Sequence, residues 1–211
     1  MVDANSRYSS DQENFWAGEF GQGYMARNND EALIAASTWR FSKILSCAPG
    51  VHSIVEFGCN IGLNLSALQR INPKFDLHAY EINENAAAQA RDRTGANVIN
   101  ATIAEKFNSD KQFDLAFTSG VLIHINPDLL SNVYDNLYNI SRKYICVCEY
   151  YNPTPVSVNY RGHKDRLFKR DFAGDLIERF GLRLINYGFE YKRDNYFPQD
   201  DVTWFLLEKI S

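Results

Sequence analysis

Two carboxylates and a short glycine-containing segment carry the clearest chemistry in the sequence. Glu56 lies in an apolar, strand-like run that leads directly into Gly58, Asn60 and Gly62. Glycine lets the main chain approach a ligand without a Cβ, so that the N–H groups of the turn and of the next helix face the ligand. Glu81 ends a second apolar segment roughly 20 residues later, where a carboxylate can accept hydrogen bonds from a ribose diol. The pattern predicts a site for a nucleotide-like cofactor.

A nicotinamide dinucleotide is a poor match to this loop. The G-x-G-x-x-G fingerprint places its second glycine against the pyrophosphate, and Asn60 occupies that position here. Asparagine enters the left-handed region more readily than other non-glycine residues, so the turn itself can be kept. We therefore expect a cofactor without a pyrophosphate.

Alternating strands and helices are needed to bring these residues together. We expect strands at 54–57, 75–80, 97–102, 113–118 and 142–149, and helices at 30–47, 63–70, 83–93 and 172–180. Two further strands, at 182–191 and 201–209, are joined by a turn around 195–198. This order predicts a doubly wound, Rossmann-like α/β sheet of about seven strands.

The loop resembles the first motif of the class I S-adenosylmethionine (SAM)-dependent methyltransferases, an acidic residue followed by x-Gly-x-Gly-x-Gly. The motif stands here as Glu56, Gly58, Asn60 and Gly62. The resemblance implies SAM as cofactor and S-adenosylhomocysteine (SAH) as product. It also implies a methyltransferase core over residues 51–211, with residues 1–50 as a helical lid segment of the same structural domain.

Further cofactor candidates follow from their place in this pattern. Tyr24 and Arg27 share a helix face, and the arginine fork suits the carboxylate of SAM. The aromatic stretch around them either folds over the ligand or packs on the sheet as a helix. In the methyltransferase pattern the loop after the third strand borders the adenine. The complete set of cofactor candidates is Trp16, Tyr24, Arg27, Glu56, Gly58, Asn60, Gly62, Glu81, Ile82, Ala101, Thr102 and Ser119.

Acceptor candidates follow the fourth and fifth strands, where the carboxyl end of the sheet meets cofactor and acceptor. A run of five Lys and Arg within ten positions, 161–170, either forms a solvated face or rims a pocket for an anionic substrate. A hydroxyl acceptor requires a base, whereas an ionised oxygen requires only orientation. The catalytic candidates are His124, His163 and Tyr151, and the substrate-binding candidates are Tyr150, Tyr160, Arg161, Lys164 and Arg166.

Three stretches are similar to the small bacterial methyltransferases associated with pseudaminic acid biosynthesis. They are 15–21 with Tyr24 and 27–28, 55–64 with 81–83, and 151–155 with 160–172. The resemblance includes Asn60 in place of the usual glycine. It implies in-line O-methylation of a small anionic acceptor in surface-glycan biosynthesis, such as a nonulosonic acid or a capsule precursor.

Composition narrows the alternatives. A net charge of −4 over 211 residues gives no footprint for nucleic acid, and the four cysteines show no metal-type spacing. We expect a cytoplasmic protein without a membrane span or a metal, as a monomer or a dimer. An RNA methyltransferase is disfavoured by the charge and by the lack of an Asn/Asp-Pro-Pro-aromatic motif after the fourth strand. A non-catalytic SAM-binding partner of a biosynthetic complex is the other alternative.

Overall fold

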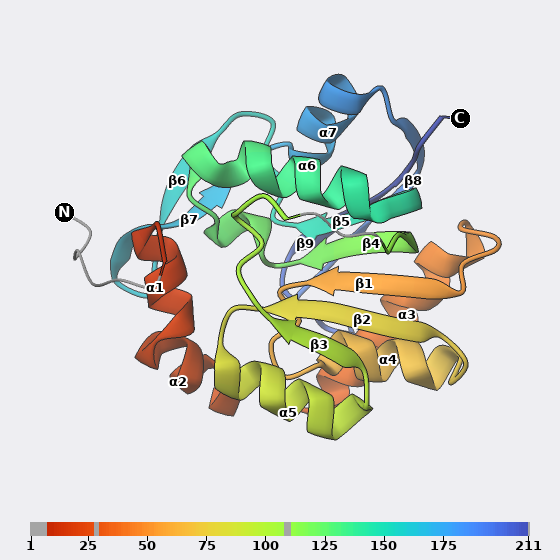
Figure 1. The fold of residues 1–211 in the computed structure, drawn as a ribbon, viewed down its shortest axis with the longest axis horizontal. Coiled ribbons are helices and arrows are strands. Elements are labelled where there is room, and N and C mark those ends of the chain that lie inside the picture. The colour runs from red at the N-terminus through yellow and green to blue at the C-terminus, as the bar shows by residue number, and fades with distance from the viewer. Residues whose placement is uncertain (1–7, 28–29, 108–110, 211) are drawn as a thin grey trace.

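The computed structural model describes residues 8–27, 30–107 and 111–210, with the side chains of residues 26 and 27 left out. Strands and helices alternate through most of the chain (Figure 1). The central elements are β1 (Ser53–Phe57), α4 (Leu63–Ile71), β2 (Asp76–Glu81), α5 (Glu84–Thr94), β3 (Asn97–Asn100), β4 (Phe113–Ser119), α6 (Leu130–Ile140) and β5 (Ser141–Glu149). They are followed by α7 (Phe172–Phe180), β8 (Arg183–Glu190) and β9 (Val202–Glu208).

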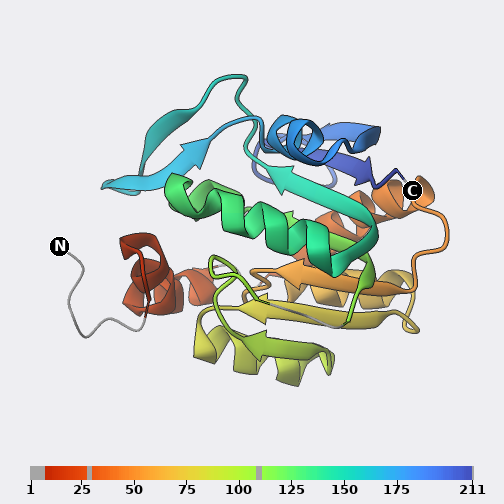
Figure 2. The ribbon, with the colours of Figure 1, turned by 45° about the horizontal axis from the view of Figure 1, so that its top comes forward.

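The main sheet confirms the predicted fold. Its seven strands have the order β3-β2-β1-β4-β5-β9-β8; β1 to β5 run parallel, and β9 is antiparallel to both of its neighbours, β5 and β8. Helix α3 (Glu31–Ser46) packs with α4 and α5 on one face, and α6 and α7 cover the other (Figures 1 and 2). Because both faces are covered, the central strands are apolar on both sides. β1 and β4 are neighbours at the point where the strand order reverses, and crevices form at the carboxyl ends of strands there.

The N-terminal helices α1 (Asp11–Ala17) and α2 (Glu19–Arg27) lie at this carboxyl edge, toward which the strand arrows point in Figure 1. Helix α1 begins with a capping box in which Ser10 and Glu13 satisfy each other's backbone N–H groups. The capping box stabilises the start of α1 through contacts within the helix itself, and both helices lie over the carboxyl edge of the sheet.

A second, two-stranded sheet is formed by β6 (Val156–Tyr160) and β7 (His163–Lys169). Its turn contains Arg161 at φ 48° and Gly162 at φ 86°, the left-handed pair that suits a tight hairpin. The sequence did not predict this hairpin, because the stretch has the composition of a polar loop at 150–155 followed by a basic run at 161–170. Most of the hairpin is exposed, so polar residues on both faces hide the alternation that marks a half-buried strand.

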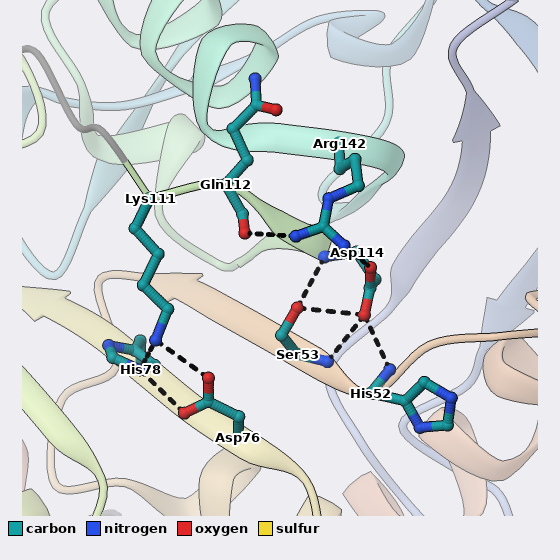
Figure 3. Close-up of polar contacts among 8 residues, drawn as sticks. All are labelled: His52, Ser53, Asp76, His78, Lys111, Gln112, Asp114 and Arg142. Carbon is teal, nitrogen blue, oxygen red and sulfur yellow. Dashed lines mark hydrogen bonds and ion pairs between the residues drawn. The ribbon is translucent and has the colours of Figure 1, made fainter.

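The opposite, amino-terminal edge of the sheet is held by polar side chains. The Asp114 carboxylate accepts hydrogen bonds from the backbone N–H groups of His52 and Ser53 at 2.9 Å each, and pairs with Arg142 at 2.9 Å (Figure 3). These contacts join the starts of β1, β4 and β5. Nearby, Lys111 and His78 meet the exposed carboxylate of Asp76.

Candidate functional site

A cavity of about 700 Å³ lies at the carboxyl ends of β1, β2, β4 and β5. It brings together most of the residues that the sequence singled out. Those that line it are Trp16, Tyr24, Glu56, Gly58, Asn60, Glu81, Ile82, Ala101, Thr102, Ser119, His124, Tyr150, Tyr160 and Arg161. Gly62, Tyr151, His163, Lys164 and Arg166 are not among its lining residues, and the side chain of Arg27 lies outside the described part of the chain.

The loop after β1 follows a left-handed course. Gly58, Asn60 and Gly62 have φ values of 78°, 48° and 80°. A Cβ at Gly58 would lie 2.6 Å from Cγ2 of Val121, so this position accepts no side chain without displacing its neighbour. Gly62 instead begins α4 against α5, where a Cβ would lie 3.2 Å from Ala90. Gly62 therefore permits close helix packing and does not line the cavity.

Glu81 is fixed at the end of β2 by the same loop. Its Oε2 accepts a hydrogen bond from the backbone N–H of Asn60 at 2.7 Å, and its Oε1 accepts one from Asn83 at 2.8 Å. Burial raises the pKa of this carboxyl above its ordinary value. A carboxylate oxygen has two lone-pair sites, so both oxygens can accept a further hydrogen bond from a ligand.

Glu56 and Arg40 form a buried polar cluster in the same cavity. Glu56 Oε1 accepts a hydrogen bond from Asn64 at 2.6 Å, and Arg40 donates to Asn64 at 2.9 Å and pairs with Glu190 at 3.3 Å. Burial raises the pKa of Glu56 to about 8. Within the described ranges, Glu56 Oε2, Arg40 Nε and Gln199 Nε2 are buried without a hydrogen-bond partner. Orphaned buried polar atoms are costly, which is typical of a site that awaits a polar ligand.

Arg40 is, with Trp39, a residue that the sequence allows to face the site, but neither is among the candidate residues. The sequence did contain a signal, because Arg40 lies with Ser37 and Ile44 on the buried face of α3. A charged residue on a buried helix face requires a partner.

The comparisons with known proteins agree with this geometry. Residues 55–142 match the family model described as a methyltransferase domain, whereas no curated protein matches the chain. The structure is similar to a 1,6-didemethyltoxoflavin-N1-methyltransferase from Burkholderia thailandensis, with a TM-score of 0.71, 11% identity, and coverage of 100% of this chain and 98% of that one. It is also similar to the magnesium protoporphyrin IX methyltransferase of Synechocystis PCC 6803 with bound SAM, with a TM-score of 0.66, 11% identity, and coverage of 97% and 100%.

Residues 55–142 therefore carry a methyltransferase domain, the chain has the class I methyltransferase fold, and the enzyme is a SAM-dependent methyltransferase. Its cofactor is SAM and its product is SAH. The cavity fits such a ligand, because the amino-acid end of SAM carries an ammonium and a carboxylate. These are complementary to the unpartnered carboxylate oxygen of Glu56 and the unpartnered N–H groups of Arg40 and Gln199.

His124 lies in the 3₁₀ turn η1 (Leu122–His124) of the methyltransferase, just after β4. The buried Glu149 carboxylate accepts hydrogen bonds from the backbone N–H groups of Val121 and Leu122 at 3.0 and 3.1 Å and thereby fixes the start of this turn. The His124 ring lies 4.5 Å from the Trp16 ring, and its Nδ1 is 2.6 Å from the backbone carbonyl of Arg166. Burial lowers the pKa of His124 to about 4, so the imidazole is neutral at physiological pH.

Helix α1 connects the methyltransferase core to the β6–β7 hairpin. Glu13 accepts a hydrogen bond from Thr102, beside the cavity, and Gln12 donates one to the backbone carbonyl of Asp165 at 3.0 Å. Asn83 donates to the carbonyl of Trp16 at 3.3 Å. The aromatic N-terminal segment is therefore attached on both sides of the cavity.

The remaining predicted residues lie near the cavity without lining it. His163 packs edge-on against the stacked rings of Phe15 and Phe20, at 5.0 and 5.9 Å between ring centroids, and the Arg166 guanidinium lies 5.3 Å from the Phe15 ring. Tyr151 is 43% exposed and faces Phe205, and Lys164 is exposed. Of the basic run, Arg161 at the hairpin turn is the residue that reaches the cavity.

The described residues contain no group of three or more side chains arranged to hold a metal ion. Among the helices that the structure describes, none combines the length and apolarity that a bilayer crossing needs.

Proposed function

We propose that this methyltransferase transfers the methyl group of SAM to an oxygen of a small, anionic, sugar-linked acceptor in surface-glycan biosynthesis. The observation that carries this proposal is that a buried neutral histidine, His124, and a cation, Arg161, line the same cavity as the cofactor loop. The similarity of three stretches to the methyltransferases associated with pseudaminic acid biosynthesis supports a nonulosonic acid or a capsule precursor as the acceptor.

The cofactor is proposed to lie along the carboxyl ends of β1 to β4. Glu81 would hold the ribose hydroxyls, and Asn60 and Ser119 would border the sugar and the sulfonium. Ile82, Ala101 and Thr102 line the part of the cavity beside β3, which suits the adenine. Each of these assignments rests on the order of the loops along the sheet.

The amino-acid end of SAM is proposed to contact Glu56 and Arg40. Their orphaned atoms are complementary in charge to an ammonium and a carboxylate, respectively. Arg40 thus takes the role that the sequence suggested for Arg27. Its burial at 2% exposure places it where a guanidinium–carboxylate pair is poorly screened by solvent.

Catalysis is proposed to depend mainly on positioning. Bound SAM supplies an electrophilic methyl group on a sulfonium. Trp16, Tyr24 and Tyr160 would exclude water from the methyl group and the acceptor, with α1 and α2 serving as the lid of a core at residues 51–211. Arg161 would orient the negative charge of the acceptor. Holding two reactants in line is worth several orders of magnitude in rate.

Calorimetry with SAM, SAH and NAD tests the cofactor assignment. We expect SAM and SAH to bind at micromolar levels and NAD not to bind. Glu81→Ala should weaken SAM binding much more than it lowers stability, with the exposed Glu84→Ala at the start of α5 as the matched control. Unchanged affinity in Glu81→Ala would remove its proposed ribose role.

A labelled-methyl transfer assay tests the acceptor class. The panel is N-acetylneuraminic acid, its CMP-activated form, UDP-glucose and UDP-glucuronic acid, with a short RNA as the competing substrate. We expect transfer to an acidic sugar, and a higher KM in Arg161→Ala at unchanged SAM affinity. Transfer to the RNA alone would overturn the proposal, and SAM binding without any transfer to cell-extract precursors would favour a non-catalytic partner.

A further inference from the structure

The environment of His124 restricts the kind of atom that is methylated. A backbone carbonyl only accepts hydrogen bonds, so the 2.6 Å contact with the Arg166 carbonyl requires the proton of the neutral ring to be on Nδ1. The other nitrogen, Nε2, then presents a lone pair. Within the described residues, 8–27, 30–107 and 111–210, no group forms a hydrogen bond to Nε2.

The ring is held from two sides, which fixes where this lone pair lies. Glu149 anchors the turn that precedes His124, and the carbonyl of Arg166 anchors its Nδ1. The Trp16 and Tyr160 rings pack against it at 4.5 and 5.0 Å. His124 is 8% exposed and lines the cavity, so the lone pair is available to a ligand and largely shielded from bulk water.

We propose that the atom methylated is the oxygen of a neutral hydroxyl, and that His124 Nε2 is the general base that takes its proton while the Arg166 carbonyl holds the ring in the required tautomer. This inference rests on the proposed O-methyl transfer and specifies its acceptor group. The negative charge of the acceptor would lie elsewhere on the molecule, toward Arg161.

The chemistry of the neighbouring groups favours a hydroxyl over an ionised oxygen. A hydroxyl donates one hydrogen bond and accepts others, so it can donate its proton to the lone pair of Nε2. A carboxylate or phosphate oxygen would place a lone pair against the lone pair of Nε2.

An amine acceptor is disfavoured because, among the described residues, no carboxylate forms a hydrogen bond or ion pair with the His124 ring. The groups that face His124 are the Trp16 ring from α1, the Tyr160 ring from β6 and the Arg166 carbonyl from β7, and the Arg166 guanidinium lies over Phe15. None of these groups would stabilise a cation by ion pairing.

The proposed step is balanced in atoms and charge. The hydroxyl proton passes to His124 Nε2 as the oxygen forms its bond to the methyl carbon. The carbon–sulfur bond breaks and its electron pair stays on sulfur. The products are a methyl ether, SAH and a protonated His124, which returns its proton to solvent.

NMR of histidine tautomers in the SAH complex tests the inference without an acceptor. We expect ¹⁵N-labelled His124 to show a protonated Nδ1 and an unprotonated Nε2, and to titrate far below the ordinary histidine range. A proton on Nε2, or titration at an ordinary pKa, would overturn the inference. SAH binding in the same sample tests the proposed function separately. The protein can bind SAH even if His124 is not the general base.

A matched pair of variants tests the base in catalysis with the acceptor panel above. His124→Asn keeps an N–H that can reach the Arg166 carbonyl but removes Nε2, and His52→Asn makes the same change at an exposed position. We expect His124→Asn to bind SAH normally and to transfer methyl groups roughly 10²–10⁴-fold more slowly, with a rate that rises with pH. His52→Asn should behave as wild type.

The chemical stability of the methylated product provides a further test of which group is methylated. A methyl ether keeps its label in mild alkali, a methyl carboxylate ester releases it as methanol, and a methylated amine is retained on a cation exchanger. A methyl phosphate ester also survives alkali, but its methyl protons show coupling to ³¹P. Label that survives alkali, is not cationic and shows no ³¹P coupling supports the inference. An ester, a methylated amine or an unimpaired His124→Asn would overturn it.

Discussion

At the scale of single residues, we expect the buried carboxyl of Glu56 to couple SAM binding to proton release. Its pKa of about 8 means that it is mostly protonated at neutral pH, and an ammonium beside Oε2 would favour the ionised form. We expect SAM affinity to rise by up to about tenfold per pH unit from pH 6 to 8. Above about pH 8 the ligand's own α-amino group begins to lose its charge and the gain ends.

Calorimetry in buffers of different ionisation enthalpy measures this proton directly. Wild type should release close to one proton per SAM at pH 7, and Glu56→Gln should release none from this site. If wild type and Glu56→Gln release the same number of protons, the ammonium does not lie beside Glu56.

Substitution of Gly58 and Gly95 by alanine separates the cost of a left-handed backbone from the added cost of a steric clash. Gly58 and Gly95 both have left-handed backbones, but only at Gly58 would a Cβ meet another side chain, Val121 Cγ2 at 2.6 Å. Gly95→Ala should cost about 1–2 kcal/mol of unfolding free energy from the left-handed conformation alone. Gly58→Ala adds an overpacking penalty, for a total of about 2–4 kcal/mol.

Urea denaturation with SAM titration measures both variants. Gly58→Ala should also weaken SAM binding, because Val121 leads into the turn that carries His124 and the loop itself borders the cavity. Equal losses of stability in the two variants would show that the loop relaxes around the added methyl group.

At the scale of elements, we expect substitutions in the polar clusters at the amino-terminal edge of the sheet to lower the free energy of unfolding without changing SAM affinity. Asp114 is 14% exposed in its side chain and receives several hydrogen bonds, whereas Asp76 is 53% exposed in an ion pair with Lys111. Asp114→Asn should cost about 1.5–3 kcal/mol, and Asp76→Asn less than about 1 kcal/mol. SAM affinity should be unchanged in both, because neither residue lines the cavity.

The pH dependence of this effect has a definite sign. Hydrogen bonds from His52 and Ser53 and the Arg142 charge together hold the pKa of Asp114 below its ordinary value of 3.8, despite opposing burial. Its contribution is therefore complete above about pH 4 and is lost as the pH falls through the folded-state pKa. The difference in thermal unfolding between wild type and Asp114→Asn should shrink as the pH falls below the ordinary aspartate pKa, and a difference that is independent of pH would contradict this account.

The sequence predicts elements well where periodicity and burial agree. β1, β4 and most of β5 are buried, largely apolar segments, and β2 alternates buried with more exposed residues; the structure confirms all four within a few residues. The β6–β7 hairpin was not predicted because its stability comes from pairing and from contacts with α1 rather than from a hydrophobic face. Arg40 illustrates the same limit, because its partners Asn64 and Glu190 are distant in sequence.

At the scale of the whole molecule, the structure consists of a buried sheet core and a smaller, more exposed cap over the carboxyl edge of the sheet. Two hydrophobic clusters bury the central strands between the helix layers. The cap comprises α1, α2 and the β6–β7 hairpin, and its parts contact each other through Gln12 with Asp165 and Phe15 with His163. Because the Arg166 carbonyl belongs to the hairpin, the position of the hairpin and the orientation of His124 are linked.

We expect backbone amides in the cap and in the core to exchange hydrogen at different rates. In the ligand-free protein, backbone amides of residues 11–17 and 156–169 should exchange faster than those of β4 and β5, because Val156 and Val158 are about 40% exposed and few buried contacts hold the hairpin. SAH should slow exchange in both cap segments together. Gln12→Ala should speed exchange in both at once, since this side chain joins them, whereas Ser42→Ala on the exposed face of α3 should affect neither. If Gln12→Ala accelerates α1 and leaves the hairpin unchanged, the two segments open independently, and the orientation of His124 does not depend on the N-terminal helix.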